Sequence, residues 1–202
     1  NLGLKAHISV RVNPNIDAHV DHHVATGLGD SKFGVKLTDV IALYQKAAEL
    51  KEIEIEGISC HIGSLVESTV PYMSEIEVLS VFVNELLDRG IALKHFDIGG
   101  GAGVAYKADE KTLEPSELIP AVVAQIRSLV KIPDIEILIE PGRSIIAQAG
   151  VLLTRVEYLK SGLFERNFCV VDASMTELVR PAMYGSHHEI EPMSPRSDIE
   201  PE

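Results

Sequence analysis

The strongest constraint on the fold is an alternation of strand-like and helix-like segments, which repeats four times at a spacing of roughly forty residues. Short strand-like runs lie at residues 6–12, 56–61, 94–98 and 136–139. Amphipathic stretches with apolar residues at helical spacing lie at residues 37–51, 71–89 and 115–130. This alternation predicts an α/β fold with a parallel sheet. A closed eight-stranded barrel needs about 250 residues, so four units cannot close one.

The pattern changes near residue 150. Residues 151–160 and 167–171 are strand-like, with no amphipathic helix between them. We therefore predict two domains, an α/β domain over residues 1–149 and the start of a β-rich domain with a tail over residues 150–202. Residue 1 is Asn, and residues 189–202 are rich in proline and glutamate. We expect the chain to be an internal piece of a longer protein.

Composition and charge exclude several classes of partner. The chain has 18 basic and 30 acidic side chains, so we expect no nucleic-acid partner and no broad attraction to anionic lipid. No apolar run approaches the length that spans a bilayer, and we expect no membrane partner. The two cysteines, Cys60 and Cys169, are too few for a disulfide framework. They predict a reducing compartment, with the cytoplasm as the expected location.

The segment CHIGS at residues 60–64 ends the second predicted strand, where parallel α/β folds bind their ligands. Because successive strand side chains point to opposite faces, Cys60 and His61 cannot both face one pocket, which argues against a Cys–His nucleophilic pair. His61 can stack on a flat ligand while Ser64 offers a hydroxyl to an anion. Taken alone, a hydrogen-bonded core histidine is the better interpretation of His61.

Four glycines within residues 99–103 directly follow the third predicted strand, in the segment DIGGGAG. Glycine runs allow close approach of the backbone to a ligand, and their amides form an anion nest. The dinucleotide-binding fingerprint fails because Tyr106 occupies its third glycine position, and no Gly-Lys-Ser/Thr follows as a P-loop requires. A phosphate-binding nest is therefore favoured over a plain turn.

The segment EPGR at residues 140–143 closes the fourth predicted strand. Glu140 can hold a protonated pyridine nitrogen, and Arg143 can bind a phosphate or a carboxylate. A local ion pair is an equally good interpretation of the two. Further along, Pro181 interrupts the segment that carries Arg180 and Tyr184, so we expect neither a strand nor a helix there. From the residues alone, a solvated arginine and a packed tyrosine are favoured.

Two groups of histidines could suggest a metal site. His19, His22 and His23 are loosely spaced, and no cysteine or glutamate cluster supports them. The same holds for His187 and His188. We expect both groups to be solvated loops and predict no metal.

In this order, the segments CHIGS, DIGGGAG, EPGR and DASM…RPAMYG resemble the alanine-racemase-fold (fold type III) PLP-dependent decarboxylases. Within this family the chain most resembles the diaminopimelate decarboxylases. The loop TGLGDSKFGV and the segment RVNP add to the resemblance, which covers nearly all of residues 5–190. It implies part of a parallel (β/α)8 TIM-like barrel that binds pyridoxal 5'-phosphate (PLP), followed by the start of a β-rich C-terminal domain. It also implies decarboxylation of meso-2,6-diaminopimelate to L-lysine and CO2, in lysine biosynthesis.

The resemblance assigns roles to individual residues. His61 would stack on the PLP ring, and Glu140 would bind the pyridine nitrogen. Arg143 would lie on the side of the phosphate and the substrate carboxylate. The phosphate would be bound by a hydroxyl and three backbone amides, which belong to Ser64, Gly100, Gly101 and Gly103. His61 and Glu140 are the implied catalytic residues. Glu140 would keep the ring nitrogen protonated, which draws charge from the carbon that loses CO2. Arg180 and Tyr184 match the family residues that bind the distal carboxylate of diaminopimelate.

The sequence departs from the family pattern at several points. The Tyr-Ala-x-Lys motif, whose lysine forms the Schiff base with PLP, is absent, and Lys5 and Lys32 match other parts of the family. The Cys-Glu-Ser segment, which reaches across a dimer interface, and the distal tyrosine near the family's C-terminus are also absent. Ala102 replaces a larger apolar residue, and Thr176-Glu177 replace Asn-Asp, which affects the neighbouring turn. We therefore expect a central fragment, inactive alone, of an enzyme that forms a homodimer.

Three other functions stay open on the sequence. A related decarboxylase of ornithine, arginine or carboxynorspermidine would share most of the motifs, but a second substrate carboxylate better explains a cation such as Arg180. A non-catalytic decarboxylase-like protein would bind a ligand without the lysine. A generic phosphate-binding α/β domain would explain the glycine run but leave His61, Glu140 and Arg180 unexplained.

Overall fold

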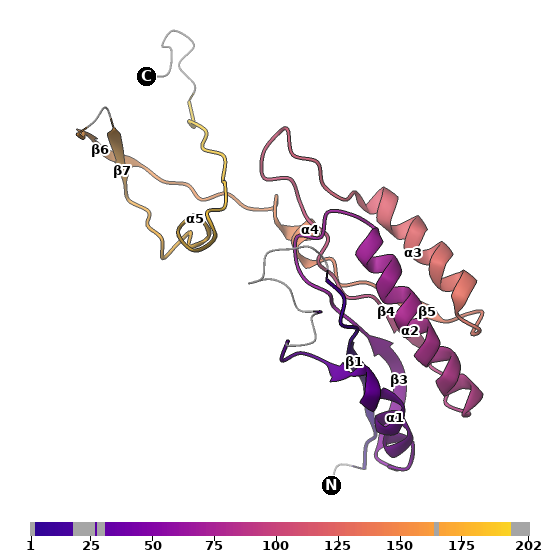
Figure 1. The fold of residues 1–202 in the computed structure, drawn as a ribbon. Coiled ribbons are helices and arrows are strands. Elements are labelled where there is room, and N and C mark those ends of the chain that lie inside the picture. Colours follow the sequence, from indigo (N-terminus) through magenta and orange to yellow (C-terminus); the bar gives the residue numbers. More distant parts are fainter. Residues whose placement is uncertain (1–2, 18–26, 28–30, 164–165, 195–202) are drawn as a thin grey trace. The chain divides into compact units, whose positions relative to one another are not determined.

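The computed structural model describes residues 3–17, 27, 31–163 and 166–194 (Figure 1). The chain forms two compact units. The first comprises residues 1–104 and 111–147, and the second comprises residues 105–110 and 148–202. Each unit is described by itself below.

The first unit is built on a parallel sheet of five strands in the order β2-β1-β3-β4-β5. The strands are β1 (Ala6–Asn13), β2 (Val35–Lys36), β3 (Ile53–Ser59), β4 (His95–Asp97) and β5 (Glu136–Leu138). A 3-10 turn, η1 (Leu37–Asp39), leads into α1 (Val40–Ala48), and the other helices are α2 (Val70–Asp88), α3 (Pro115–Leu129) and α4 (Gly142–Ile146). The alternation predicted from the sequence is confirmed as an α/β fold with a parallel sheet.

The long helices pack against one another in chain order, α1 on α2 and α2 on α3, and Figure 1 shows α2 and α3 side by side. Their apolar faces and the strands share one core, to which the fully buried Tyr44, Phe96 and Ile126 belong. Helix α2 ends at Asp88, and Gly90 follows with a φ of +83°, a conformation that glycine adopts without strain.

The register of the sheet aligns the carboxyl ends of its central strands. Ser59 of β3 pairs with both Arg11 of β1 and Asp97 of β4, and Asp97 pairs in turn with Leu138 of β5. The segments that follow β3, β4 and β5 therefore leave the sheet at one edge, side by side. These are the segments that carry CHIGS, the glycine run and EPGR.

The predicted strand at residues 56–61 is shifted in the structure, where β3 runs from Ile53 to Ser59. Cys60 and His61 lie beyond the strand, so strand alternation does not govern their orientation. The amino end of β3 was missed because it contains Glu54, and glutamate is unusual in strands; Glu56, which lies inside the predicted strand, is a second such residue. Both carboxylates bind the Lys94 ammonium, at 2.8 and 2.9 Å, which offsets the charge on that edge. Strand β2 and helix α4 were also missed.

The second unit contains an antiparallel pair of strands, β6 (Val156–Ser161) and β7 (Asn167–Val171), and a short helix, α5 (Arg180–Tyr184). Residues 151–155 are not part of β6, contrary to the sequence prediction. The expectation that Pro181 prevents a helix is wrong, because Pro181 lies in the first turn of α5. The amide of a first-turn residue has no acceptor within its helix, so proline is tolerated there.

Among the described residues, no helix combines the length and the apolar character that crossing a bilayer requires. The described part of the first unit is an open sheet with β2 and β5 at its edges. Closure of a barrel, and the division into domains at residues 1–149 and 150–202, therefore stay predictions.

Candidate functional site

His61 is fixed by the glycine run. The N–H of Gly100 donates a hydrogen bond to Nδ1 of His61 at 3.1 Å. An amide can only donate, so Nδ1 accepts and the proton of the neutral imidazole lies on Nε2. His61 is thus hydrogen-bonded, as the interpretation from the residues alone had it, but its half-buried ring does not belong to the core. The bond also orients the half-buried ring at the carboxyl edge of the sheet.

Two effects keep the His61 imidazole neutral. Burial lowers its pKa first, and the Arg11 guanidinium lowers it further, while Asp97 opposes them. Because the folded protein has the lower pKa, the unfolded chain binds protons more readily as the pH falls. As the pH falls through the lowered pKa of His61, the free energy of unfolding therefore decreases, and it increases again as the pH rises.

We predict that Arg11→Gln raises the pKa of His61 towards its usual value, because it removes a positive charge that disfavours the imidazolium. The measurement is a pH titration of the His61 ring by NMR. The control is Lys32→Gln, which removes a cation that lies, like Arg11, over the Phe33 ring but does not act on His61. An unchanged His61 pKa in Arg11→Gln would contradict the prediction.

The glycines hold neighbouring backbone segments together. A Cβ at Gly99 would overlap the Cys60 carbonyl oxygen, and one at Gly100 would overlap the Glu140 carbonyl oxygen. Gly99 and Gly101 also have φ values of +68° and +104°, which side chains rarely adopt. The run therefore lets the segments after β3, β4 and β5 approach within backbone contact.

The predicted amide nest is partly occupied by the protein itself. The Gly100 N–H donates to His61, and the Gly103 N–H donates to the Val66 carbonyl oxygen at 3.1 Å. Among the described residues, the Gly101 N–H makes no hydrogen bond with the protein. The phosphate role stays a prediction for all three amides. To bind a phosphate, the N–H groups of Gly100 and Gly103 would have to release His61 and the Val66 carbonyl oxygen. Ser64, on the neighbouring segment, is half-buried.

Glu140 and Arg143 follow β5 at the same edge. The Glu140 N–H donates to the Gly99 carbonyl oxygen at 2.8 Å, which continues the pairing of β4 and β5 beyond the strands. The Glu140 side chain is exposed, and Arg143 lies half-buried in α4, which Pro141 precedes. The structure thus brings four of the predicted groups to one edge: the His61 imidazole, the glycine run, the Glu140 carboxylate and the Arg143 guanidinium.

Helix α2 makes a hydrogen bond to the backbone of the glycine run. The Tyr72 hydroxyl donates to the Gly100 carbonyl oxygen at 3.1 Å, so the Gly100 residue is bound through both its N–H and its C=O. Beside it, an apolar cavity of about 260 Å³ is lined by Tyr72, Ala102, Leu118 and Ile145, among others. Sequence reasoning missed Tyr72, because nothing in its spacing from the glycines indicates contact.

In the second unit, Arg180 and Tyr184 are brought together, with Tyr106 as an unpredicted third member. The Arg180 guanidinium lies 5.4 Å from the Tyr106 ring centre and 5.6 Å from that of Tyr184. Its Nη2 donates to the Ser186 hydroxyl at 3.1 Å. Its Nε is buried and has no hydrogen-bond partner among the described residues. A fixed guanidinium with an unused donor is suited to a carboxylate ligand.

The turn at Thr176-Glu177, where the sequence departs from the family, is closed by Glu177 itself. Its carboxylate accepts hydrogen bonds from the Thr176 hydroxyl at 2.7 Å and from the Ser174 amide and hydroxyl, each at 2.8 Å. These bonds lower the pKa of Glu177 to about 2. The substitution therefore leaves a well-bonded turn.

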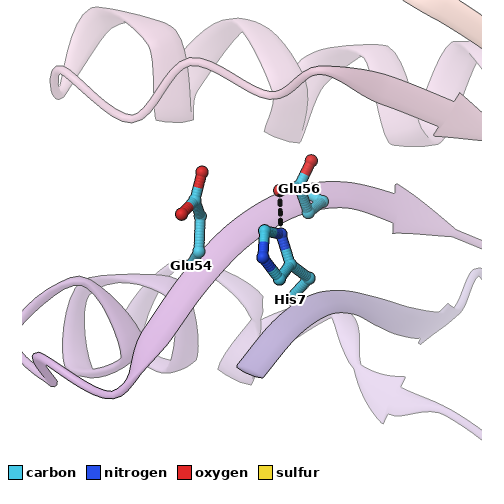
Figure 2. A group of neighbouring side chains, drawn as sticks. All are labelled: His7, Glu54 and Glu56. Carbon is cyan, nitrogen blue, oxygen red and sulfur yellow. Dashed lines mark hydrogen bonds and ion pairs between the residues drawn. The ribbon is translucent and has the colours of Figure 1, made fainter. Parts of the chain in front are cut away.

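His7, Glu54 and Glu56 form a cluster of metal-ligating types at the amino ends of β1 and β3 (Figure 2). The ring Nδ1 of His7 contacts Glu56, and the Lys94 ammonium bridges both glutamates, so a side-chain cation already occupies the position between the two carboxylates. Lys94 is also the main cause of the lowered pKa of each carboxyl. The cluster lies at the opposite strand ends from His61. His19, His22 and His23 lie outside the described residues.

Both cysteines are free in the structure. Cys60 is buried, and burial raises the pKa of its thiol well above the usual range. A thiol that stays protonated is a poor nucleophile. This agrees with the argument against a Cys60–His61 catalytic pair, although for a different reason from strand alternation.

Comparison with known proteins gives the family. The model of the pyridoxal binding domain of pyridoxal-dependent decarboxylases matches residues 2–147. The chain is 41% identical to the diaminopimelate decarboxylase of Pseudomonas aeruginosa over 195 residues, which are 96% of this chain and 46% of the relative. It is 40% identical to that of Vibrio cholerae, with the same coverage. The chain thus spans about half the length of the curated relatives it matches.

Solved structures agree with the sequence comparison. Diaminopimelate decarboxylase from Helicobacter pylori, complexed with L-lysine, has a TM-score of 0.88 and 35% identity, over 97% of this chain and 48% of that one. Lysine decarboxylase from Selenomonas ruminantium has a TM-score of 0.74 and 25% identity, over 91% and 45%. The resemblance found in the motifs is confirmed: the chain belongs to the pyridoxal-dependent decarboxylases.

Proposed function

We propose that this chain is part of a PLP-dependent decarboxylase that converts meso-2,6-diaminopimelate to L-lysine and CO2. Relatives named diaminopimelate decarboxylase, at 38–41% identity, support this substrate, as do the neighbouring structures complexed with L-lysine. The observation that carries the proposal is the convergence of a neutral His61, the glycine run and Glu140 at one sheet edge.

The functional groups at the carboxyl edge of the sheet are of the types that bind PLP. A neutral imidazole can stack on the ring, a carboxylate can hold the protonated pyridine nitrogen, and hydroxyl, amide and guanidinium donors suit a phosphate. In this chain they are His61, Glu140, Ser64, Gly101 and Arg143. When bound, PLP supplies an electron sink for the bond that releases CO2.

The chain's own residues contribute binding, orientation and one held proton. Glu140 keeps a proton on the pyridine nitrogen. Its side chain is exposed in the described residues, so its carboxylate is accessible to a ligand. His61 offers its ring face without a positive charge, since burial and Arg11 keep it neutral. Ser64, Arg143 and the Gly101 N–H hold the phosphate, and the N–H groups of Gly100 and Gly103 stay on His61 and Val66 unless they exchange those acceptors for it.

We assign the distal carboxylate of the substrate to Arg180 and Tyr184. The stacked guanidinium and its unused Nε donor support this role. We further propose that residues 1–149 form part of a (β/α)8 barrel, that residues 150–202 begin a β-rich domain, and that the whole enzyme is a cytoplasmic homodimer. The related decarboxylases of ornithine, arginine or carboxynorspermidine stay open as alternatives, and the likeness to the Selenomonas ruminantium enzyme adds a lysine decarboxylase to them.

A PLP titration of the 202-residue chain tests the proposed cofactor. We expect saturable binding by absorbance and fluorescence, and no covalent adduct after borohydride, because this sequence has no Tyr-Ala-x-Lys motif. Pyridoxal, which lacks the phosphate, is the matched control and should bind far more weakly. Absence of saturable PLP binding, or equal binding of pyridoxal, would contradict the proposal.

A further inference from the structure

Helix α2 carries a buried acid beneath the strand ends. The side chain of Glu75 is 0% exposed, and neither of its carboxyl oxygens has a nitrogen or oxygen hydrogen-bond partner among the described residues, which leaves the Cys60 thiol as the polar group that acts on the carboxyl. A buried polar group without a partner costs free energy, and an apolar side chain of similar volume would remove this cost. Stability alone therefore gives no reason for an acid at this position.

The groups around Glu75 belong to the candidate site. The Cys60 thiol interacts with its carboxyl, and the Asp97 carboxylate acts on it through space. The Cys60 N–H donates to the Asp97 carbonyl oxygen at 3.0 Å, and the Asp97 side chain accepts from the Gly99 N–H at 2.8 Å. Glu75 thus lies beside Cys60 and Asp97, where the segment that carries His61 contacts the segment that leads into the glycine run.

The surroundings of Glu75 favour its protonated form. Burial raises the pKa of the carboxyl well above the usual range, the Cys60 thiol lowers it, and the Asp97 carboxylate raises it. A protonated carboxyl has one O–H donor and a carbonyl acceptor, the same polar functions that glutamine offers. Tyr72, one turn earlier on α2, bonds the Gly100 carbonyl oxygen, so two polar side chains of this helix support one pair of loops.

We propose that Glu75 is a positioning residue: a buried carboxyl on α2 whose contact with the Cys60 thiol holds the Cys60–His61 segment where the Gly100 N–H reaches the His61 ring. It acts through His61 and does not itself touch cofactor or substrate. The orientation of His61 is a property of the protein alone. Only the consequence for PLP binding rests on the proposed function.

The test compares Glu75→Gln with two apolar variants, Glu75→Leu and Glu75→Met, in the full 202-residue chain. Ser80→Ala is the control, because Ser80 lies on the same helix and is also buried with an unpaired hydroxyl. The readouts are thermal melting, the ¹⁵N resonance of His61 Nδ1, which reports the tautomer and its hydrogen bond, and the Kd of PLP.

We expect Glu75→Gln and Ser80→Ala to keep the His61 resonance and to bind PLP within twofold of the parent. The two apolar variants should melt at or above the parent's temperature, yet lose the Nδ1 signature and bind PLP about tenfold more weakly. An unchanged His61 resonance in both apolar variants would overturn the proposal. A lower melting temperature in both would also overturn it, because the acid would then be structural.

The two proposals fail separately. If the parent chain does not bind PLP but the apolar variants still change the His61 resonance, the positioning role stands and the cofactor assignment falls. If PLP binds the parent and both apolar variants equally, the cofactor assignment stands and the positioning role falls.

Discussion

Gly100→Ala should destabilise the first unit by about 3 kcal/mol and lower its melting temperature by roughly 6–12 °C. The added Cβ would overlap the Glu140 carbonyl oxygen. Overpacking is relieved when a flexible side chain moves, but here the obstacle is backbone on an adjacent segment. That segment is fixed by the Glu140 N–H, which donates to the Gly99 carbonyl oxygen at 2.8 Å. Relief would require breaking this bond.

The same substitution should impair the site. Gly100 is bound on both sides, through its N–H to His61 and through its C=O to Tyr72. Displacing the residue would release the imidazole, so we expect PLP binding to weaken with the loss of stability. Calorimetry and a urea titration measure the first effect, and the PLP titration measures the second.

Gly142→Ala is the matched control. Gly142 lies two residues beyond Glu140, and a Cβ there would meet no atom within 4 Å. Alanine is also the better helix former, and Gly142 begins α4, so this variant should be as stable as the parent or slightly more stable. If Gly100→Ala loses less than about 1 kcal/mol, an ordinary value for point substitutions, the close packing of the segments after β4 and β5 is wrong.

The fold was largely predictable because its periodic signals are local. The helical stretches at residues 71–89 and 115–130 became α2 and α3 almost unchanged, and the strand at residues 6–12 became β1. The errors arose where tertiary contacts override local preference. Glu54 and Glu56 are tolerated in β3 because Lys94, from a distant part of the chain, binds both. No local pattern reveals such a pairing.

The site was predictable in outline but not in detail. Because parallel strands end at one edge, the sequence could indicate that CHIGS, the glycine run and EPGR meet there. It could not indicate that Gly100 bonds His61, or that Tyr72 and Glu75 reach the same loops from a helix. These contacts depend on the register of β3 and β4 and on the rotation of α2, which residue spacing does not determine.

Arg180→Gln should weaken binding of the distal carboxylate by about a hundredfold. Losing one member of a desolvated charge pair costs about 2–5 kcal/mol, or roughly 30-fold to several thousand-fold in affinity. We expect about a hundredfold loss, near the lower end, because the Arg180 side chain is only half-buried. The Tyr106 and Tyr184 rings would remain, but neither carries a positive charge to replace the guanidinium.

Two stable ligands make the test specific. One is the borohydride-reduced adduct of PLP with one amino group of diaminopimelate, which retains the distal carboxylate. The other is the reduced adduct with the α-amino group of D-lysine, which lacks that carboxylate but is otherwise similar in shape. Arg180→Gln should lose about a hundredfold in affinity for the first ligand and less than threefold for the second.

Arg155→Gln controls for the general loss of a cation in the second unit, since the Arg155 side chain is 79% exposed and pairs with Asp172 and Glu157. It should leave both affinities unchanged, because an exposed ion pair contributes little. Equal losses for the two adducts in Arg180→Gln would mean that Arg180 supports the fold or contacts a part common to both ligands. The preference for diaminopimelate over a substrate with one carboxylate would then need another cation.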